Sequence, residues 1–405
     1  MKILITNTGP WGTGSFTVAH AVLQELVCLG HEVKLFFPDT GIPSKDLDYY
    51  YQNKDWFEIW KFPISDGTTY LESFPLIIPD PHPRSGETKT YKELTDKERM
   101  LFYQAAEKNL HPLLESFKPD IVECQHIWSL DAIVHEAGYP YICTAHHSDQ
   151  MGFLYDKSMQ SRCLDAAKNA KAIIAVSNFV KKEVLQLYGV PDNKVHVLTN
   201  GYNKTIFQPM DVNKEAALKM LDVPYKKDAY YVSFAGKLSK TKGIDILLLA
   251  NKLLPKEENI HFLVLGAGDL SKALDQEKLT EYCYDRVHFL GHQTQPALAE
   301  IHNLSDLSIL PSRSEGFGIA CLEAMGCGVP VVVTRSGGMT DFAKGRIIPI
   351  ENPKALADAV LEIKNLHQEE YRSLCFDALH TAQSFSWAEI AKKRVELYQD
   401  CLKKT

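Results

Sequence analysis

The chain has 405 residues, 45% hydrophobic and 23% charged, a composition typical of a soluble globular protein that is too long for one hydrophobic core. Its formal net charge is −7, from 44 basic and 51 acidic residues, which argues against general nucleic-acid binding because such binding needs a basic surface. No run of about twenty uncharged apolar residues occurs, so we expect no transmembrane helix. Nine cysteines without a CxxC pair indicate reduced thiols and a cytoplasmic protein.

The first half of the chain alternates between apolar runs and amphipathic segments. The N-terminal run KILIT, too short for a signal peptide, is followed by a glycine-rich loop, an amphipathic segment closed by Gly30, and the run HEVKLFF. This order of strand, helix and strand predicts a parallel sheet. Further runs occur in PDIVECQH, YPYICTAHH and AKAIIAVSN, and each ends in small or polar residues, as buried parallel strands do.

Residues 39–100 interrupt this alternation with aromatic clusters and a turn-rich stretch around Arg84. We interpret this segment as an insertion of irregular loops on the working edge of the domain, with Trp56 and Trp60 as candidates for acceptor recognition. A peripheral hairpin that only covers a sheet edge is an equal alternative. The segment also holds a D-x-D sequence, which we expect to be surface rather than a metal site because no predicted strand ends there.

The alternation restarts near residue 200, with AYYVSFAGKL, IHFLVLGAG, LSILPS and VPVVVT as apolar runs between helical segments. The sequence therefore predicts an α/β fold with two Rossmann-like doubly wound domains that face each other across a cleft. We expect the domains to be residues 1–199 and 200–385, with a hinge near 199–210. Residues 386–405 have the apolar spacing of an amphipathic helix.

In open parallel sheets, ligands bind beyond the carboxyl ends of the strands, and residues 311–326 run from such an end through a glycine-bearing turn into a helix. Glu323, about five residues into the helix, would lie roughly 7–8 Å along its axis, close enough to reach a ribose hydroxyl. Glu315 would face whatever the diphosphate carries. An acidic first turn that complements the helix dipole is the alternative, but it explains one glutamate and not two. The N–H groups that would seat the diphosphate belong to Gly316, Phe317, Gly318 and Ile319.

A second strand-end loop, residues 236–243, begins at Gly236 and carries Lys237, Lys240 and Lys242. Lysines at this position could neutralise a diphosphate leaving group. A lysine-rich turn that is simply solvated surface is the alternative.

In the first half, His146 and His147 follow the run YPYIC. Adjacent side chains diverge and no third ligand lies at metal spacing, so we prefer a hydrogen bond from His146 to substrate over a metal site. A histidine held by the main chain of a turn is the alternative. The loop with Gly12 and Gly14 lacks the third glycine of a dinucleotide fingerprint, and it predicts only a close backbone approach to a ligand.

Together these segments resemble the retaining glycosyltransferases of family 4, which have the GT-B architecture. The resemblance rests on the E-x7-E spacing of Glu315 and Glu323 in SEGFGIACLEAMGCGVPVVVT, and on FAGKLSKTKGID, VLTNGYNKTIFQP and FSWAEIAKKRVELY. It spans nearly the whole chain outside residues 39–100. It implies that a nucleotide sugar binds the second domain, that the acceptor binds the first, and that helix 386–405 packs back on the first domain.

The resemblance implies a metal-independent front-face reaction without a cofactor, with a UDP-sugar favoured over a GDP-sugar. The residues that it implies for catalysis are Glu315, His146, Lys242 and Lys237. For the donor it adds Glu323 at the ribose and Gly14 near the phosphate, beside Gly236 and the start of the helix. The implied acceptor set is Gly12, Ser15, Arg84 and His147.

The chain departs from the family pattern at three places. Lys237 stands where arginine is usual, so phosphate clamping loses the bidentate fork and could be shared with Lys240. Asp341 stands where glutamate is frequent, and Gly-Thr-Gly-Ser replaces a Gly-Gly-x-E-like loop on the acceptor side. Three alternatives stay open: a sugar phosphorylase, a nucleotide-sugar epimerase, and a catalytically silent nucleotide-sugar-binding subunit. The sequence leaves a homodimer open and does not identify the acceptor.

Overall fold

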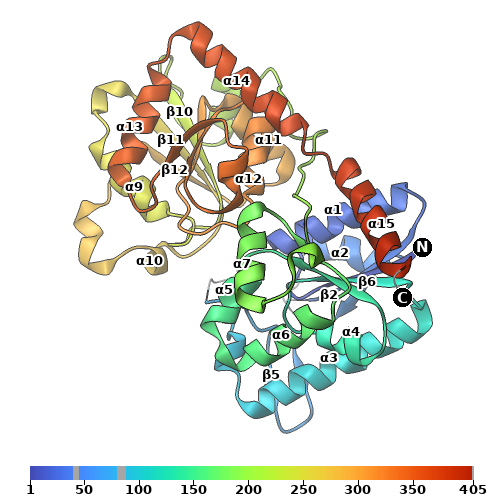
Figure 1. Cartoon of the computed structure of the whole chain (residues 1–405). Coiled ribbons are helices and arrows are strands. Elements are labelled where there is room, and N and C mark those ends of the chain that lie inside the picture. The colour runs from blue at the N-terminus through green and yellow to red at the C-terminus, as the bar shows by residue number, and fades with distance from the viewer. Residues whose placement is uncertain (40–44, 80–87, 404–405) are drawn as a thin grey trace. The chain divides into compact units, whose positions relative to one another are not determined.

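The computed structural model describes residues 1–39, 45–79 and 88–403. The chain divides into two compact units (Figure 1). Unit 1 comprises residues 1–200 together with 387–405, and unit 2 comprises residues 201–386. Among the described helices, none has the length and apolar character needed to cross a bilayer.

Unit 1 is built on a seven-stranded sheet with the order β3-β2-β1-β6-β7-β8-β9, in which every neighbouring pair is parallel. The order of strands reverses between β1 and β6, and such a switch point is where ligands bind in doubly wound sheets. The strands are β1 (Lys2–Asn7), β2 (Glu32–Pro38), β3 (Phe57–Trp60), β6 (Ile121–Gln125), β7 (Tyr141–Ala145), β8 (Ile173–Ala175) and β9 (Val195–Val197).

The helices of unit 1 begin where side chains can cap them. Thr13 Oγ1 accepts a hydrogen bond from the amide of Phe16 at the start of α1, and Ser177 Oγ accepts one from Val180 at the start of α7, which satisfies amides that a helix start leaves unpaired. The C-terminal helix α15 packs on α1. The helices are α1 (Gly14–Cys28), α2 (Lys45–Gln52), α3 (Asp96–Phe117), α4 (Leu130–Glu136), α5 (Ser148–Tyr155), α6 (Gln160–Asn169), α7 (Asn178–Tyr188) and α15 (Trp387–Lys403).

The described part of residues 39–100 is more regular than the sequence suggested. It contains α2, the edge strand β3 parallel to β2, and a short antiparallel pair, β4 (Ile64–Ser65) and β5 (Tyr70–Leu71). Its aromatic residues explain this regularity, because Trp60 is only 2% exposed and the ring of Tyr50 packs edge-on against Phe57 at 5.0 Å between centroids. The interpretation as irregular loops is therefore wrong here, and Trp60 belongs to the core. The D-x-D sequence lies in α2, where Asp48 is exposed as expected.

Unit 2 has a six-stranded sheet with the order β12-β11-β10-β13-β14-β15, again with all neighbouring pairs parallel. Its switch point lies between β10 and β13, which pair through Val232 and Leu307. The predicted fold class, with two doubly wound α/β sheets, is confirmed. The strands are β10 (Tyr230–Ala235), β11 (Ile260–Leu265), β12 (Val287–Gly291), β13 (Leu307–Leu310), β14 (Val331–Thr334) and β15 (Gly345–Ile348). The helices are α8 (Lys214–Met220), α9 (Ile244–Leu253), α10 (Leu270–Ala273), α11 (Gln295–Leu304), α12 (Ile319–Gly326), α13 (Pro353–Lys364) and α14 (Gln368–Gln383).

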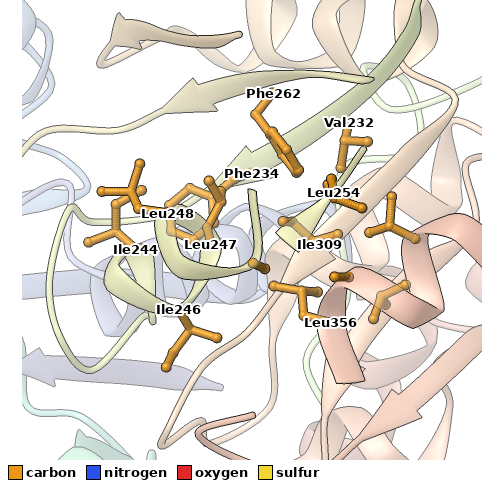
Figure 2. Close-up of a cluster of buried hydrophobic side chains, with 14 of the residues drawn as sticks. Val232, Phe234, Ile244, Ile246, Leu247, Leu248, Leu254, Phe262, Ile309 and Leu356 are labelled. Carbon is orange, nitrogen blue, oxygen red and sulfur yellow. The ribbon is translucent and has the colours of Figure 1, made fainter. Parts of the chain in front are cut away.

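The core of unit 2 follows from the alternation of side chains along β10. Val232 and Phe234 point to one face, where they pack with Phe262 of β11, Leu247 of α9 and Leu356 of α13 (Figure 2). Tyr231 points to the other face and joins a second buried cluster with residues of α8 and α11. Because helices cover both faces, the strands are mostly apolar, and the loops at their carboxyl ends are held by a packed scaffold.

Candidate functional site

Two loops of unit 2 follow the neighbouring strands β10 and β13, at the switch point of the sheet. Residues 236–243 connect β10 to α9, and residues 311–318 connect β13 to α12. Main-chain contacts join them, because the amide of Arg313 donates to the carbonyl of Thr241 at 2.8 Å. The two loops, which the sequence suggested as separate candidates, therefore form one continuous surface.

Lys242 and Glu315 meet on this surface. Lys242 Nζ lies 2.5 Å from Glu315 Oε2, and both side chains remain partly exposed. Ser312 Oγ lies 3.5 Å from the same carboxylate oxygen. A cation and a carboxylate at the carboxyl end of the sheet are suited to hold an anion and a hydroxyl group side by side.

Arg313, which the sequence did not single out, fixes the geometry of both loops. Its guanidinium forms a two-point ion pair with Asp245 at the start of α9, at 2.8 and 2.7 Å, and its Nε lies 2.8 Å from Glu351. It also donates to the carbonyl of Lys240. The hydrogen bonds that Arg313 donates to Asp245 and Glu351 raise its pKa, so the charge that ties the loops together is permanent. Asp245 and Arg313 are 68 positions apart, so the sequence alone does not predict their contact. The only signal for Arg313 in the sequence is its position two residues before Glu315.

Close backbone packing shapes the start of α12. Gly318 caps this helix with a φ of 91° and no side-chain cap, a conformation that favours glycine. A Cβ atom there would lie 2.3 Å from Met339 Cγ, and one on Gly337 would lie 1.6 Å from the carbonyl oxygen of Glu315. The helix start is thereby held in place by main chain, which leaves its N–H dipoles suited to an anion.

Glu323 lies one turn further along α12 and is 8% exposed. Burial raises the pKa of Glu323 to about 7. Within the described residues we find no ion pair to this carboxyl group. A buried carboxyl group with a raised pKa and no cation is uncommon in a purely structural setting, and such groups concentrate at functional sites.

The two remaining donor candidates differ in their surroundings. Lys237 lies two residues after the end of β10 and is half-buried. At Gly236, a Cβ atom would meet the side chain of Lys242 at an ordinary 3.7 Å. The glycine at 236 is therefore not required by packing in unit 2.

In unit 1, polar residues gather where β1, β6 and β7 end. His146 Nε2 lies 2.7 Å from Gln125 Oε1, and its ring is 5.0 Å from that of His126. His126 Nδ1 lies 2.6 Å from Thr8 Oγ1. Burial lowers the pKa values of His126 and His146, so both are neutral near pH 7. His126 was missed from the sequence, although it follows the run PDIVECQ as His146 follows YPYIC.

The predicted acceptor residues, and the predicted donor residue Gly14 beside them, differ in their exposure and contacts. Gly12 has a φ of 77°, and Gly14 is exposed, with nothing within 4 Å of a Cβ placed there. Gly14 therefore leaves room for a ligand, whereas Ser15 is buried. His147 is also buried, with Nδ1 2.7 Å from Glu183 Oε2, so its ring anchors α5 to α7. Arg84 lies outside the described residues.

No group of three or more histidine, cysteine, aspartate or glutamate side chains suited to a metal ion occurs in the described ranges.

Two family models together match most of the sequence. "Glycosyltransferase Family 4" matches residues 12–205, and "Glycosyl transferases group 1" matches residues 220–374. The chain belongs to this family of glycosyltransferases. The resemblance drawn from the motifs is thus confirmed, and the chain is a glycosyltransferase of a retaining family that uses nucleotide sugars.

Relatives known by sequence are distant. An uncharacterized glycosyltransferase of Methanocaldococcus jannaschii is 28% identical over 324 residues, which are 74% of this chain and 80% of that protein. A D-inositol 3-phosphate glycosyltransferase of Xylanimonas cellulosilytica is 28% identical over 243 residues, 58% of each chain.

Solved structures share the fold. HepE from Anabaena, crystallised with UDP-glucose, superposes with a TM-score of 0.76 at 17% identity and covers 99% of this chain and 100% of its own. Sucrose-phosphate synthase from Thermosynechococcus elongatus superposes with a TM-score of 0.74 at 18% identity over the whole of both chains. These similarities establish the GT-B fold of the family 4 glycosyltransferases.

Proposed function

We propose that this glycosyltransferase moves a hexosyl group from a nucleotide-diphosphate sugar, with UDP as the favoured nucleotide, to an acceptor hydroxyl group without a metal ion. The observation that carries this proposal is the pairing of Lys242 with Glu315 beside the start of α12, with the buried Glu323 one turn further along the helix. The preference for UDP is supported by HepE, whose solved complex contains UDP-glucose.

In this proposal each group has a defined role toward the donor. The N–H groups at the start of α12 bind the diphosphate, and Lys242 and Lys237 neutralise its charge. Glu323 accepts hydrogen bonds from ribose hydroxyl groups, and Glu315 accepts them from the donor sugar. Because Lys242 already contacts Glu315, a bound diphosphate shares this lysine with the carboxylate that orients the sugar.

The reaction that we propose is a front-face substitution. The bond from the anomeric carbon to the diphosphate oxygen breaks, and a bond from the acceptor oxygen forms on the same face. The acceptor proton passes to the departing diphosphate oxygen. Lysines and helix amides aimed at that oxygen stabilise the charge that develops there, which is where electrostatic catalysis has its largest effect.

The acceptor side is assigned to the ends of β1, β6 and β7 in unit 1. His146 would hydrogen-bond to substrate, and the loop with Gly12 and Gly14 would approach it closely. Ser15 and Arg84 stay in the proposed acceptor set, whereas we leave out His147 because Glu183 holds its ring.

The decisive experiment compares two residues of the donor site with an exposed lysine elsewhere in unit 2. Lys242→Ala and Glu315→Ala should each lower kcat with a UDP-sugar by at least a hundredfold, the scale expected when a group that stabilises developing charge is lost. Lys219→Ala removes an equal charge from an exposed position of α8, outside both loops, and should retain kcat within about threefold. Turnover of all three variants within a few-fold of the unmodified protein would contradict the assignment.

Ligand-dependent unfolding separates this function from its alternatives. With a chelator present, a nucleotide at a hundred times its dissociation constant should stabilise the protein by about 2.7 kcal/mol. Stabilisation by UDP without turnover on any acceptor would identify a silent binding subunit. A requirement for orthophosphate would identify a phosphorylase, and product formation without an acceptor would identify an epimerase.

A further inference from the structure

A buried charge in unit 1 connects the candidate substrate histidine to the C-terminal helix. Glu123 on β6 and Arg394 on α15 are both fully buried and form an ion pair, although 271 positions separate them in the sequence. Buried charges are costly unless they are fully hydrogen-bonded. The partners of Glu123 therefore determine what this pair can do.

Glu123 is the acceptor of a complete set of hydrogen bonds. Its Oε1 accepts from Arg394, from Thr144 Oγ1 at 2.7 Å, and from Gln125 Nε2 at 2.7 Å. Its Oε2 accepts from the hydroxyl group of Tyr398, also on α15. Burial alone would raise the pKa of Glu123, but Arg394 and these hydrogen bonds lower it below its ordinary value. Glu123 is therefore ionised, and an ionised carboxylate accepts hydrogen bonds but cannot donate one.

This requirement fixes the orientation of the next side chain. Because Glu123 can only accept, the amide nitrogen of Gln125 must face it, and the amide oxygen must face the other way. That oxygen lies 2.7 Å from His146 Nε2 and can only accept in turn. The hydrogen atom between them therefore belongs to His146.

We propose that Gln125, Glu123 and Arg394 are positioning residues that hold His146 as the neutral tautomer protonated on Nε2, so that Nδ1 is the hydrogen-bond acceptor offered to a substrate hydroxyl group. The contact with substrate rests on the proposed function, whereas the tautomer does not. Burial lowers the pKa of His146, as do His126 and Arg394, which keeps the ring neutral near pH 7. Within the described residues we find no protein partner for Nδ1.

The first test observes the tautomer directly. Protein labelled with ¹⁵N on its 15 histidines is studied at pH 7.5 by correlating ring nitrogens with ring carbon-bound protons, and His146 is assigned by the loss of its signals in His146→Gln. We expect a protonated Nε2 and an unprotonated Nδ1 in the unmodified protein. In Gln125→Leu, which removes the acceptor, both tautomers should be populated. Protonation on Nδ1 in the unmodified protein, or an unchanged tautomer in Gln125→Leu, overturns the proposal.

A control separates positioning from general damage to the core. Tyr141 is a buried tyrosine of β7 whose hydroxyl group donates to the carbonyl of Ala166 at 2.8 Å, outside this network. Tyr141→Phe should leave the His146 tautomer and kcat unchanged. Gln125→Leu should lower kcat about 10- to 100-fold, the range typical of groups that orient a functional side chain, with KM for the donor changed by less than threefold.

A second variant tests the same proposal in case Gln125→Leu prevents folding. Glu123→Gln combined with Arg394→Met removes both buried charges at similar volume, which is often tolerated. Without a carboxylate, the amide of Gln125 is free to turn, and the tautomer of His146 should become mixed. Retention of the single Nε2–H tautomer in this variant contradicts the role of Glu123 and Arg394. If the unmodified protein shows the expected tautomer but transfers no sugar to any acceptor, the proposed function fails while the positioning network stands.

Discussion

At the scale of single residues, the most informative group is the carboxyl group of Glu323. Its pKa of about 7 is above that of the unfolded chain, so the folded state binds the proton more tightly. The protonated carboxyl group therefore makes its full contribution to the stability of the folded state below the unfolded pKa. This contribution is lost as the pH rises toward 7. A difference of this size corresponds to about 3 kcal/mol.

This sign leads to a prediction for Glu323→Gln. The variant should match the unmodified protein in stability at pH 4, below the unfolded pKa of a glutamate, and exceed it at pH 8 by up to about 3 kcal/mol, because an amide does not ionise. It should nevertheless bind the nucleotide more weakly, since an amide oxygen is a poorer acceptor for ribose hydroxyl groups than a carboxylate. Denaturant unfolding at both pH values, with and without UDP, measures both effects. Equal pH dependence in the two proteins would show that burial does not perturb this group.

The residue scale also shows what the sequence could predict. Glu315, Glu323 and Lys242 were found because helix geometry and strand-end loops give them a local pattern. Arg313 and Gln125 were not, since their partners Asp245 and His146 are placed by tertiary packing. Contacts of that kind have no spacing that a single sequence reveals.

At the scale of elements, the two donor loops depend on one arginine. Arg313→Lys keeps the charge but loses the fork that spans both oxygens of Asp245. We expect a loss of about 1–3 kcal/mol in stability and a clear weakening of nucleotide binding, because the 236–243 loop is no longer tied to the start of α12. Calorimetric titration with UDP measures the affinity, and thermal unfolding measures the stability.

The matched control is another arginine of unit 2. Arg346 pairs with Glu362 at 2.6 Å on the surface, where an ion pair contributes about 0–1 kcal/mol. Arg346→Lys should leave both measurements close to those of the unmodified protein. If the two variants behaved alike, the connection between the loops would have no influence on the donor site.

Elements were also predicted unevenly from the sequence. The strands of both sheets were recognised because buried parallel strands are continuous apolar runs. Strand β3 and helix α2 were missed because their aromatic residues, such as Trp60 and Tyr50, form neither an alternating nor a helical pattern. Trp60 packs into the core from the short edge strand β3, and Tyr50 packs from α2 against Phe57 of that strand. Only the fold could reveal these contacts.

At the scale of the whole molecule, the ion pair between Glu123 and Arg394 connects distant parts of unit 1. Arg394→Met leaves a buried carboxylate without its cation, which we expect to cost about 3–5 kcal/mol. Hydrogen exchange should show loss of protection in β6 and β7, whereas β10 and β13 of unit 2 should be unaffected. Uniform loss across both units would mean that they unfold as one, contrary to their separate cores.

The division of the chain has a consequence for its synthesis. Unit 2 is one continuous stretch, residues 201–386, whereas unit 1 needs α15 from the far end of the sequence. Unit 2 therefore needs no segment from outside its own range, whereas Glu123 of unit 1 has no hydrogen bonds from Arg394 and Tyr398 until the last helix has been synthesised. The half that is translated second can thus form its core from its own continuous sequence. The half that is translated first should depend longest on chaperones that shield its unfinished core.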